Sequence, residues 1–322
     1  MVEPISEAQR GAIQSGRRTR LSWSRQRGFG TRVRHRAEWL AMLAVLGAFR
    51  ALPLEMASNL GGWIGRKLVA PRYVAKPAVV NSVRVPFPAA TDAEVVAILT
   101  EMSDNIVRVG VETAHLKVLA RDHGRIVLEG VEHLAAARAG GRGLLFIGGH
   151  FCNWEVAGIA LRRVGIDGAF AVMPPSNPYV FDWLARWRMS VGFSEQVNAG
   201  EGVYRAFRRR LRGGGVAGLL ADQRLENGIK APFFGREVTT NVVPARLART
   251  LGIAVVPLAI ERVAGRVAAF RLEVHPPLEF EHSGDNDADE RAFTARINAF
   301  FENEIRRQPG QWLWADPRWD DL

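Results

Sequence analysis

Two kinds of hydrophobic periodicity divide this chain near residue 120. In the segment that begins at Thr91, apolar residues recur at helical spacing, at positions 95, 96, 99, 102, 106 and 109. Thr91 and Glu94 form a capping-box pattern that predicts the helix start, and the helical spacing continues to about Leu119. After residue 120, short apolar runs alternate with helical stretches, which predicts strands and helices in turn.

The second part of the chain favours a layered α/β fold. The predicted strands lie at 126–128, 144–147, 169–172, 216–220, 253–259 and 267–274. The predicted helices lie at 132–139, 156–163, 178–190, 201–212, 241–251 and 289–307. Alternation of this kind is typical of a mainly parallel central sheet flanked by helices. We therefore expect a disordered basic tail at 1–36, a helical membrane-associating region at 37–120 and an α/β domain at 121–322.

Two apolar segments precede the Thr91 helix. The first, from Trp39 to Phe49, has eleven residues without charge, and Pro53 separates it from the second, Leu54 to Leu68. A membrane-spanning helix needs about 20 apolar residues, so the first segment is too short to span alone. We expect two short helices that lie in the membrane interface, with a buried helical hairpin as the alternative. Between this region and the Thr91 helix, the proline-rich residues 71–88 predict an extended segment.

Charge supports a membrane surface as a partner. The net charge of the chain is +10, and nine arginines against Glu3 and Glu7 place +7 of it in residues 1–36. A basic segment directly before an apolar one fits an anionic lipid surface, and no nucleic-acid-binding motif accompanies it. We therefore expect no nucleic acid partner. A second basic stretch, Gly202 to Arg212, is either a solvated helix face or a surface for acidic lipid headgroups or an acidic carrier protein.

The most informative stretch for chemistry is Gly148-Gly149-His150-Phe151-Cys152-Asn153-Trp154-Glu155. It follows a predicted buried strand and precedes a predicted helix, so His150 is expected on the turn between them. From that turn the imidazole can fold back toward the carboxylate of Glu155, which would orient the ring and stabilise its protonated form. This is the base and the orienting group of a catalytic triad without a nucleophile, so the attacking oxygen would come from a substrate hydroxyl.

This stretch resembles the HX4(D/E) box of bacterial lipid acyltransferases, in the form typical of the late lipid A (lauroyl/myristoyl-type) acyltransferase family. The resemblance covers roughly residues 37–319. Further matching stretches follow in the family's order, namely Ala221-Asp222-Gln223, Pro232-Phe233-Phe234-Gly235, Thr239-Thr240, Ala245-Arg246-Leu247-Ala248 and Gln311-Trp312-Leu313-Trp314. The ordered set is much more specific than one H–x4–E pair.

The resemblance implies a glycerolipid acyltransferase-like fold and an O-acyltransferase on the cytoplasmic face of the cell inner membrane. The donor would be a thioester of acyl carrier protein or of CoA, and the acceptor a hydroxyl of a lipid, foremost a lipid A precursor. His150 and Glu155 would be the catalytic residues. Asn177, Asp222 and Gln223 match polar positions of the family that would shape the acceptor site. Because guanidinium groups pair well with phosphate, Arg188 and Arg318 are candidate phosphate partners.

The chain departs from the family in ways that leave the acceptor open. Met173 stands where lipid A enzymes usually have arginine, and Ala315 to Arg318 replaces a His-Arg-Arg run. Fewer cations would suit a less phosphorylated acceptor, such as a glycolipid or an aminolipid. The same residues would also be compatible with an inactive membrane-binding protein or with a thioesterase.

Cys152 is the only cysteine, where the family commonly has glycine, and we expect it to pack rather than to act as a nucleophile. The sequence has no zinc-type Cys/His spacing and no phosphate loop, so we expect no metal and no cofactor.

Overall fold

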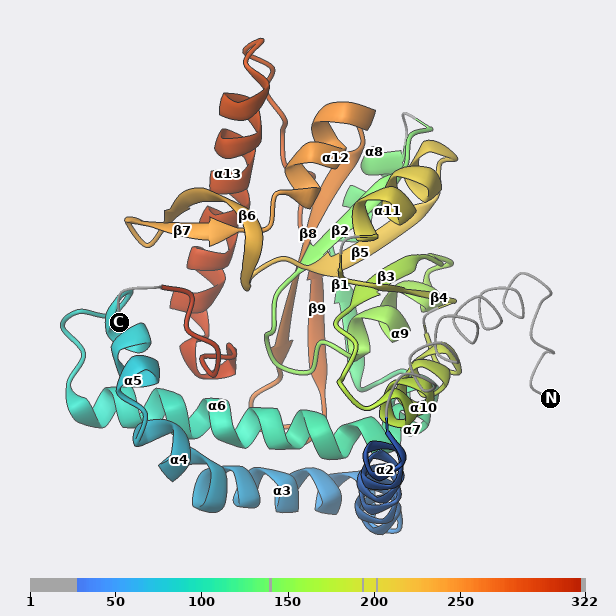
Figure 1. Cartoon of the computed structure of the whole chain (residues 1–322), viewed down its shortest axis with the longest axis vertical. Coiled ribbons are helices and arrows are strands. Elements are labelled where there is room, and N and C mark those ends of the chain that lie inside the picture. The colour runs from blue at the N-terminus through green and yellow to red at the C-terminus, as the bar shows by residue number, and fades with distance from the viewer. Residues whose placement is uncertain (1–27, 139–140, 193, 201, 320–322) are drawn as a thin grey trace.

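A computed structural model describes residues 28–138, 141–192, 194–200 and 202–319. The N-terminal part is helical: α2 (Phe29–Arg50), α3 (Leu54–Ile64), a π-helical turn (Gly65–Val69), α4 (Ala70–Val74), α5 (Pro77–Arg84), α6 (Asp92–Glu112), a 3₁₀ turn (Thr113–His115) and α7 (Leu116–Arg121). In Figure 1, α3 lies under α6, and α6 crosses the lower end of the sheet. Residues 1–27 of the predicted basic tail lie outside the described residues, whereas 29–36 are helical and begin α2, which corrects the prediction for those residues.

The proline-rich segment is helical rather than extended, which corrects the prediction. Pro71 and Pro77 occupy the first turns of α4 and α5, where the missing N–H of proline costs nothing and its φ angle suits a helix. The Thr91–Glu94 capping box is confirmed, because the Thr91 side chain accepts from Glu94 N and the Glu94 carboxylate accepts from Thr91 N. The helical pattern that we expected to reach Leu119 is divided by the 3₁₀ turn between α6 and α7.

The second part of the chain is the predicted α/β domain. Its strands are β1 (Ile126–Glu129), β2 (Leu144–Gly148), β3 (Ala169–Val172), β4 (Glu195–Asn198), β5 (Val216–Leu220), β6 (Arg224–Phe233), β7 (Arg236–Thr240), β8 (Ala254–Arg262) and β9 (Phe270–Val274). Its helices are α8 (Glu132–Arg138), α9 (Val156–Arg163), α10 (Pro178–Met189), α11 (Val203–Arg212), α12 (Val243–Leu251) and α13 (Asn286–Arg307), followed by a 3₁₀ turn (Pro309–Gln311).

Seven strands form one sheet in the order β1-β9-β8-β2-β5-β3-β4. Neighbours from β8 through β4 pair in parallel, whereas β9 is antiparallel to β8 and β1 is parallel to β9. The central sheet is therefore mainly parallel, as predicted. All five residues of β2 are buried, which is the pattern of a strand covered by helices on both faces. The antiparallel hairpin of β6 and β7 stands apart from this sheet and packs against α13 (Figure 1).

Candidate active site

Sheet topology brings His150 and Asp222 together. β2 and β5 are parallel neighbours in a register that pairs Gly148 with Leu220, so both strands end at the same edge. Two residues beyond each strand end stand His150 and Asp222. The Ala221 N–H donates to the Gly148 carbonyl at 2.8 Å, which continues the pairing into the two turns. Carboxyl ends of parallel strands are where α/β folds assemble their sites.

Asp222 holds His150 through both the ring and the backbone. Nδ1 of His150 lies 2.8 Å from Oδ1 of Asp222, and the His150 backbone N–H donates to Oδ2 at 2.8 Å. The Trp312 indole N–H donates to the same Oδ2 at 2.7 Å. Burial alone would raise the pKa of Asp222, but the charge and hydrogen bonds of His150 and the Trp312 hydrogen bond hold that pKa below its ordinary value. The carboxylate is thus an ionised acceptor that orients the ring.

Glu155 does not contact the imidazole, which corrects the expected geometry of the box. Its carboxylate forms a bidentate pair with the Arg188 guanidinium, in which Nε donates to Oε2 at 2.7 Å and Nη2 donates to Oε1. Glu155 precedes α9 as its N-cap residue. The physical reason is the choice of partners: Arg188 on α10 occupies both oxygens of Glu155, while the turn after the neighbouring strand β5 supplies His150 with a different carboxylate, that of Asp222.

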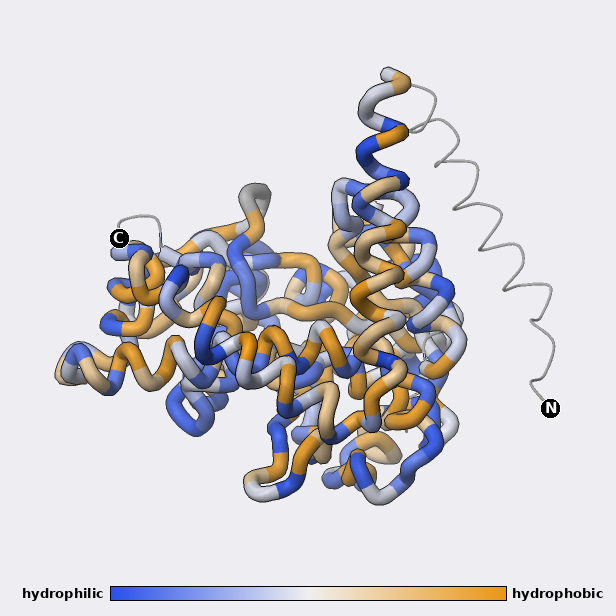
Figure 2. The backbone as a smooth tube through the Cα atoms, turned by 90° about the horizontal axis from the view of Figure 1, so that it is seen from below, coloured by the Kyte–Doolittle hydropathy of each residue, from blue (hydrophilic) through white to orange (hydrophobic). Residues whose placement is uncertain are grey.

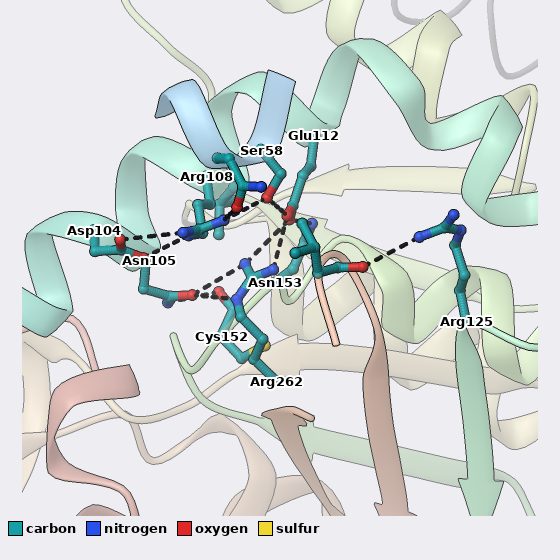
Figure 3. A network of polar contacts seen from close by, with 12 residues as sticks. Ser58, Asp104, Asn105, Arg108, Glu112, Arg125, Cys152, Asn153 and Arg262 are labelled. Atoms are coloured by element: carbon teal, nitrogen blue, oxygen red, sulfur yellow. Dashed lines mark hydrogen bonds and ion pairs between the residues drawn. The ribbon is translucent and has the colours of Figure 1, made fainter. Parts of the chain in front are cut away.

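A buried polar network anchors the turn between His150 and Glu155 to α6 (Figure 3). The Asn153 amide donates to Oε2 of Glu112 at 2.8 Å, and its carbonyl oxygen accepts from Glu155 N at 3.2 Å. The Asn105 amide donates to the Cys152 carbonyl at 3.2 Å. Two side chains of α6 thereby hold the Cys152 backbone carbonyl and the Asn153 side chain of the box.

In the same network, the negative charge of Glu112 is balanced by Arg262, the last residue of β8. Arg262 donates to both oxygens of Glu112, at 2.7 and 3.1 Å, and to Oδ1 of Asn105 at 3.2 Å. Ser58 on α3 donates to Oε1 of Glu112 at 2.7 Å. Glu112 is fully buried, so its charge is tolerated only because each of its oxygens has donors. This cluster ties α3, α6, β8 and the His150 turn into one rigid unit.

Cys152 has the environment of a packing residue. Its side chain is fully buried, and its φ of 47° lies in the left-handed region that glycine adopts most readily. Burial raises the pKa of the thiol to about 12, so the nucleophilic thiolate is not populated at neutral pH.

The other residues predicted for substrate binding are separated in the fold. Gln223 follows Asp222 and is half-buried, and its amide nitrogen has no hydrogen-bond partner among the residues that the structure describes. Asn177 caps α10 by accepting from Tyr179 N at 3.0 Å, and its amide donates to the His35 carbonyl at 2.7 Å and to Glu38 at 2.9 Å. Its polar atoms therefore join α10 to α2.

Arg318 is enclosed by protein. It donates to the Thr239 carbonyl at 2.9 Å, to Thr240 Oγ1 at 3.1 Å and to Asn298 at 3.2 Å, and it lies over the Phe233 ring. Burial lowers the pKa of its guanidinium to about 10. These contacts hold the C-terminal segment against the β6–β7 hairpin. Within the described ranges, no group of three or more His, Cys, Asp or Glu side chains is arranged to hold a metal ion.

Sequence reasoning misses three members of the site. It assigns Asp222 to the acceptor rather than to His150, and it does not single out Glu112 and Arg262. Glu112 could have been identified from the sequence, because it lies one turn beyond Val109 and so places a charged residue on the apolar, buried face of a predicted helix. Trp312 belongs to a stretch that the resemblance marks.

Comparison with known proteins finds lipid acyltransferases. The chain is 23% identical over 265 residues to a lipid A biosynthesis acyltransferase of Haemophilus influenzae, covering 81% of this chain and 79% of the relative. It is 32% identical over 212 residues to a phosphatidylinositol mannoside acyltransferase of Mycobacterium tuberculosis, covering 64% of each protein, just under two thirds. It is 30% identical over 199 residues to a lipid A biosynthesis palmitoleoyltransferase of Escherichia coli, covering 59% of this chain and 60% of the relative.

The family match extends over nearly all of the described residues. Residues 26–321 match the family described as bacterial lipid A biosynthesis acyltransferase. Both the His150 turn and the Asp222 turn fall inside this range. The chain belongs to the bacterial lipid A biosynthesis acyltransferase family.

Proposed function

We propose that this protein transfers a fatty acyl chain from a thioester to a hydroxyl of a lipid, with His150 as the general base. The observation that supports this most is the state of the imidazole: Nδ1 is held by Asp222, while Nε2 has no hydrogen-bond partner among the described residues. The ring is 24% exposed, so a substrate can reach it. A fixed tautomer with one free nitrogen is what proton transfer from a hydroxyl requires.

In this mechanism Nε2 of His150 takes the proton of the acceptor hydroxyl as its oxygen attacks the thioester carbonyl. The tetrahedral intermediate collapses, the C–S bond breaks, and the thiolate leaving group takes the proton from the imidazolium. Asp222 stabilises the imidazolium by its negative charge. Neither step needs a protein nucleophile.

Glu155 and Arg188 have a supporting role in this proposal. A carboxylate at the start of α9 is favoured by the helix dipole, and its pairing fixes the planar guanidinium of Arg188. The pair joins the His150 turn to α10. We infer that it holds the wall of the acceptor site. The Gln223 amide nitrogen, next to Asp222 in sequence, is buried and has no hydrogen-bond partner among the described residues, so a substrate would reach it only if its side chain turned outward.

The donor is a thioester of acyl carrier protein or CoA, and the acceptor is a lipid A precursor or another polar lipid. The names of the relatives support both acceptor classes, since one set acts in lipid A biosynthesis and another acylates a phosphatidylinositol mannoside. Met173 supports a less phosphorylated acceptor. It stands just beyond β3, at the edge of the sheet that carries His150, and its side chain is 70% exposed.

We also propose that the protein binds the cytoplasmic face of the inner membrane through α2 and α3. Exposed apolar side chains recur on one face of each helix: Phe29, Val33 and Leu40 on α2, and Met56, Leu60 and Trp63 on α3. Figure 2 shows the N-terminal end of α2 standing out from the rest of the protein. Of the helices in the described ranges, none combines the length and the apolar character needed to cross a bilayer.

The site lies close to this surface. α10, which carries Arg188, packs against α2, and α6, which anchors the His150 turn, packs against α3. Replacing Leu60 and Trp63 by serine should weaken binding to vesicles that contain phosphatidylglycerol, whereas the same replacement of the exposed Val127 and Val164 should not. Equal vesicle binding by both variants would remove the membrane proposal.

The test of the activity is transfer by the purified protein. A radiolabelled dodecanoyl thioester is offered with a lipid A precursor and with a glycolipid, and the lipid products are identified by mass spectrometry. The proposal predicts an acylated lipid with one acceptor class. Release of free fatty acid alone would identify a thioesterase, and no turnover with any acceptor would favour an inactive membrane-binding protein.

A further inference from the structure

α11 presents a row of arginines that the fold itself does not use. The helix, Val203–Arg212, contains five arginines and no acidic residue. Val203, Phe207 and Leu211 are buried, at spacings of four, and pack the helix onto the domain. Of the five arginines, Arg210 alone turns back to the protein, where it donates to Glu195 at 2.9 Å and to the Val216 carbonyl at 2.9 Å.

The remaining four arginines form one stripe, which we call the arginine stripe: Arg205, Arg208, Arg209 and Arg212. All four are exposed, and none has an ion pair or hydrogen bond among the described residues. Their spacing of i, i+3, i+4 and i+7 places them on one side of the helix over about 10 Å.

The arginine stripe does not stabilise the N-terminal end of α11. Cations three or four residues apart repel each other, and Arg205 stands in the first turn, where the helix dipole disfavours a positive charge. Only the arginines of the last turn are favoured by the dipole. A continuous row of unpaired guanidinium groups is therefore better explained by a partner that supplies carboxylates or phosphates.

Position in the fold indicates which kind of partner. α11 follows β4, which ends at the same sheet edge as β2 and β5, so its first turn faces the side of the site. It packs on β3, β4, β5 and α12 and lies far from α2 and α3, which occupy the bottom of the view in Figure 1. The helix that carries the arginine stripe therefore lies away from the surface that we assign to the membrane, which favours a soluble partner.

The shape of the stripe also matters. Small ligands such as a nucleotide bind in concave sites that enclose most of their surface, whereas these arginines project from the outer face of a helix. A partner that engages four of them at once must present a row of acidic groups on a surface of its own. A protein with an acidic surface meets this requirement.

We propose that the arginine stripe is the docking surface for an acidic acyl carrier protein that delivers the acyl thioester to His150. This inference rests on the proposed acyltransferase function and selects the carrier protein over CoA as the donor. Electrostatic docking of this kind mainly raises the rate of association and is weakened by salt.

Binding is measured first, with a chain that cannot turn over. His150→Ala protein is titrated with dodecanoyl-loaded acyl carrier protein, with and without the double substitution Arg208→Glu/Arg209→Glu. The matched control is Lys67→Glu/Arg121→Glu, which changes the charge equally at two exposed positions outside α11. We expect about a tenfold or greater rise in Kd for the stripe variant at low salt and less than about threefold for the control. Raising the salt from about 0.05 to 0.5 M should abolish most of the difference.

Turnover by the otherwise intact enzyme separates the donors. In the enzyme with His150 intact, Arg208→Glu/Arg209→Glu should have a higher KM for the dodecanoyl carrier protein than the wild type. Its KM for uncharged dodecanoyl-pantetheine should equal that of the wild type. Equal Kd for stripe and control variants would overturn the proposal. It would also be overturned if the stripe variant lost binding to phosphatidylglycerol vesicles and kept carrier binding, since the stripe would then be a lipid surface. Failure of the intact enzyme with every thioester would refute the proposed function, while the binding measurement still decides the docking.

Discussion

Nδ1 of His150 lies 2.8 Å from Oδ1 of Asp222, a residue 72 positions later in the chain. The bond exists because β2 and β5 are parallel neighbours that end in register. It leaves Nε2 as the ring nitrogen that is available to a substrate. The orientation of the proposed base is therefore set by a neighbouring strand rather than by the residues that follow it in sequence.

Asp222→Asn should lower kcat by about 10²- to 10⁴-fold with little change in KM, because an amide can favour the wrong tautomer and cannot stabilise the imidazolium by charge. Steady-state kinetics of the purified variant measure this, with circular dichroism as the control for folding. A loss below about threefold would mean that Asp222 only packs against the ring.

Glu155 and Arg188 should behave as a structural pair. Their side chains are 5% and 15% exposed, so Glu155→Gln alone leaves a nearly buried guanidinium without its counter-charge, at a cost of about 3 to 5 kcal/mol in the free energy of unfolding. The double variant Glu155→Gln/Arg188→Met should cost less than the sum of the single variants. Urea unfolding of all four proteins measures the coupling.

The kinetics of Glu155→Gln discriminate between two roles of the box carboxylate. If Glu155 acted on His150 directly, its loss would reduce kcat as strongly as Asp222→Asn. The structure predicts a smaller loss in kcat, accompanied by a change in KM for the acceptor.

Cys152→Gly should retain most of the activity, because a thiol with a pKa of about 12 supplies no nucleophile. Its backbone φ of 47° also predicts that Cys152→Gly is more stable than Cys152→Ala by about 1 kcal/mol, since only the alanine keeps a Cβ in the left-handed conformation. Thermal unfolding compares the two variants. A covalent acyl group on Cys152, detected by mass spectrometry of the intact protein during turnover, would contradict this mechanism.

Met173→Arg should raise kcat/KM for a bis-phosphorylated lipid A precursor relative to a less phosphorylated acceptor. An arginine–phosphate hydrogen bond contributes roughly 1.5 to 3 kcal/mol, which corresponds to about ten- to a hundredfold if it persists in the transition state. Met173→Leu is the control that removes the thioether without adding charge. If the wild type already uses the bis-phosphorylated precursor well and the arginine adds nothing, Met173 does not mark a lost phosphate contact.

Much of the fold follows from local pattern. The Thr91 capping box, the buried β2 run and the helix after it depend on neighbours in sequence, and the structure has all three. Pro71 and Pro77 mislead because proline in the first turn of a helix resembles proline in an extended segment when only the sequence is known. The polar edge strand β4 and the β6–β7 hairpin have no clear alternation, so the pattern does not predict them.

The site can be predicted only in part, because its central contact depends on strand order. The sequence places His150 on a turn after a buried strand but does not say that β5 is the neighbour of β2. Glu155 is therefore the nearest available carboxylate in sequence, whereas the fold supplies Asp222 and pairs Glu155 with Arg188. Glu112 and Arg262, 150 residues apart, meet for the same reason.

The proposed role of His150 as the base of an acyl transfer is tested most directly by the variant His150→Ala. The turnover of dodecanoyl thioester to acylated lipid is measured for the wild type and for this variant, together with thermal unfolding of both. Transfer should fall by about 10²- to 10⁴-fold or more while the protein stays folded with a lower unfolding temperature, because the backbone N–H of residue 150 and the Trp312 indole still donate to the buried Asp222 carboxylate after the ring is removed. Transfer by His150→Ala at a rate near that of the wild type would contradict the role of His150 as the base.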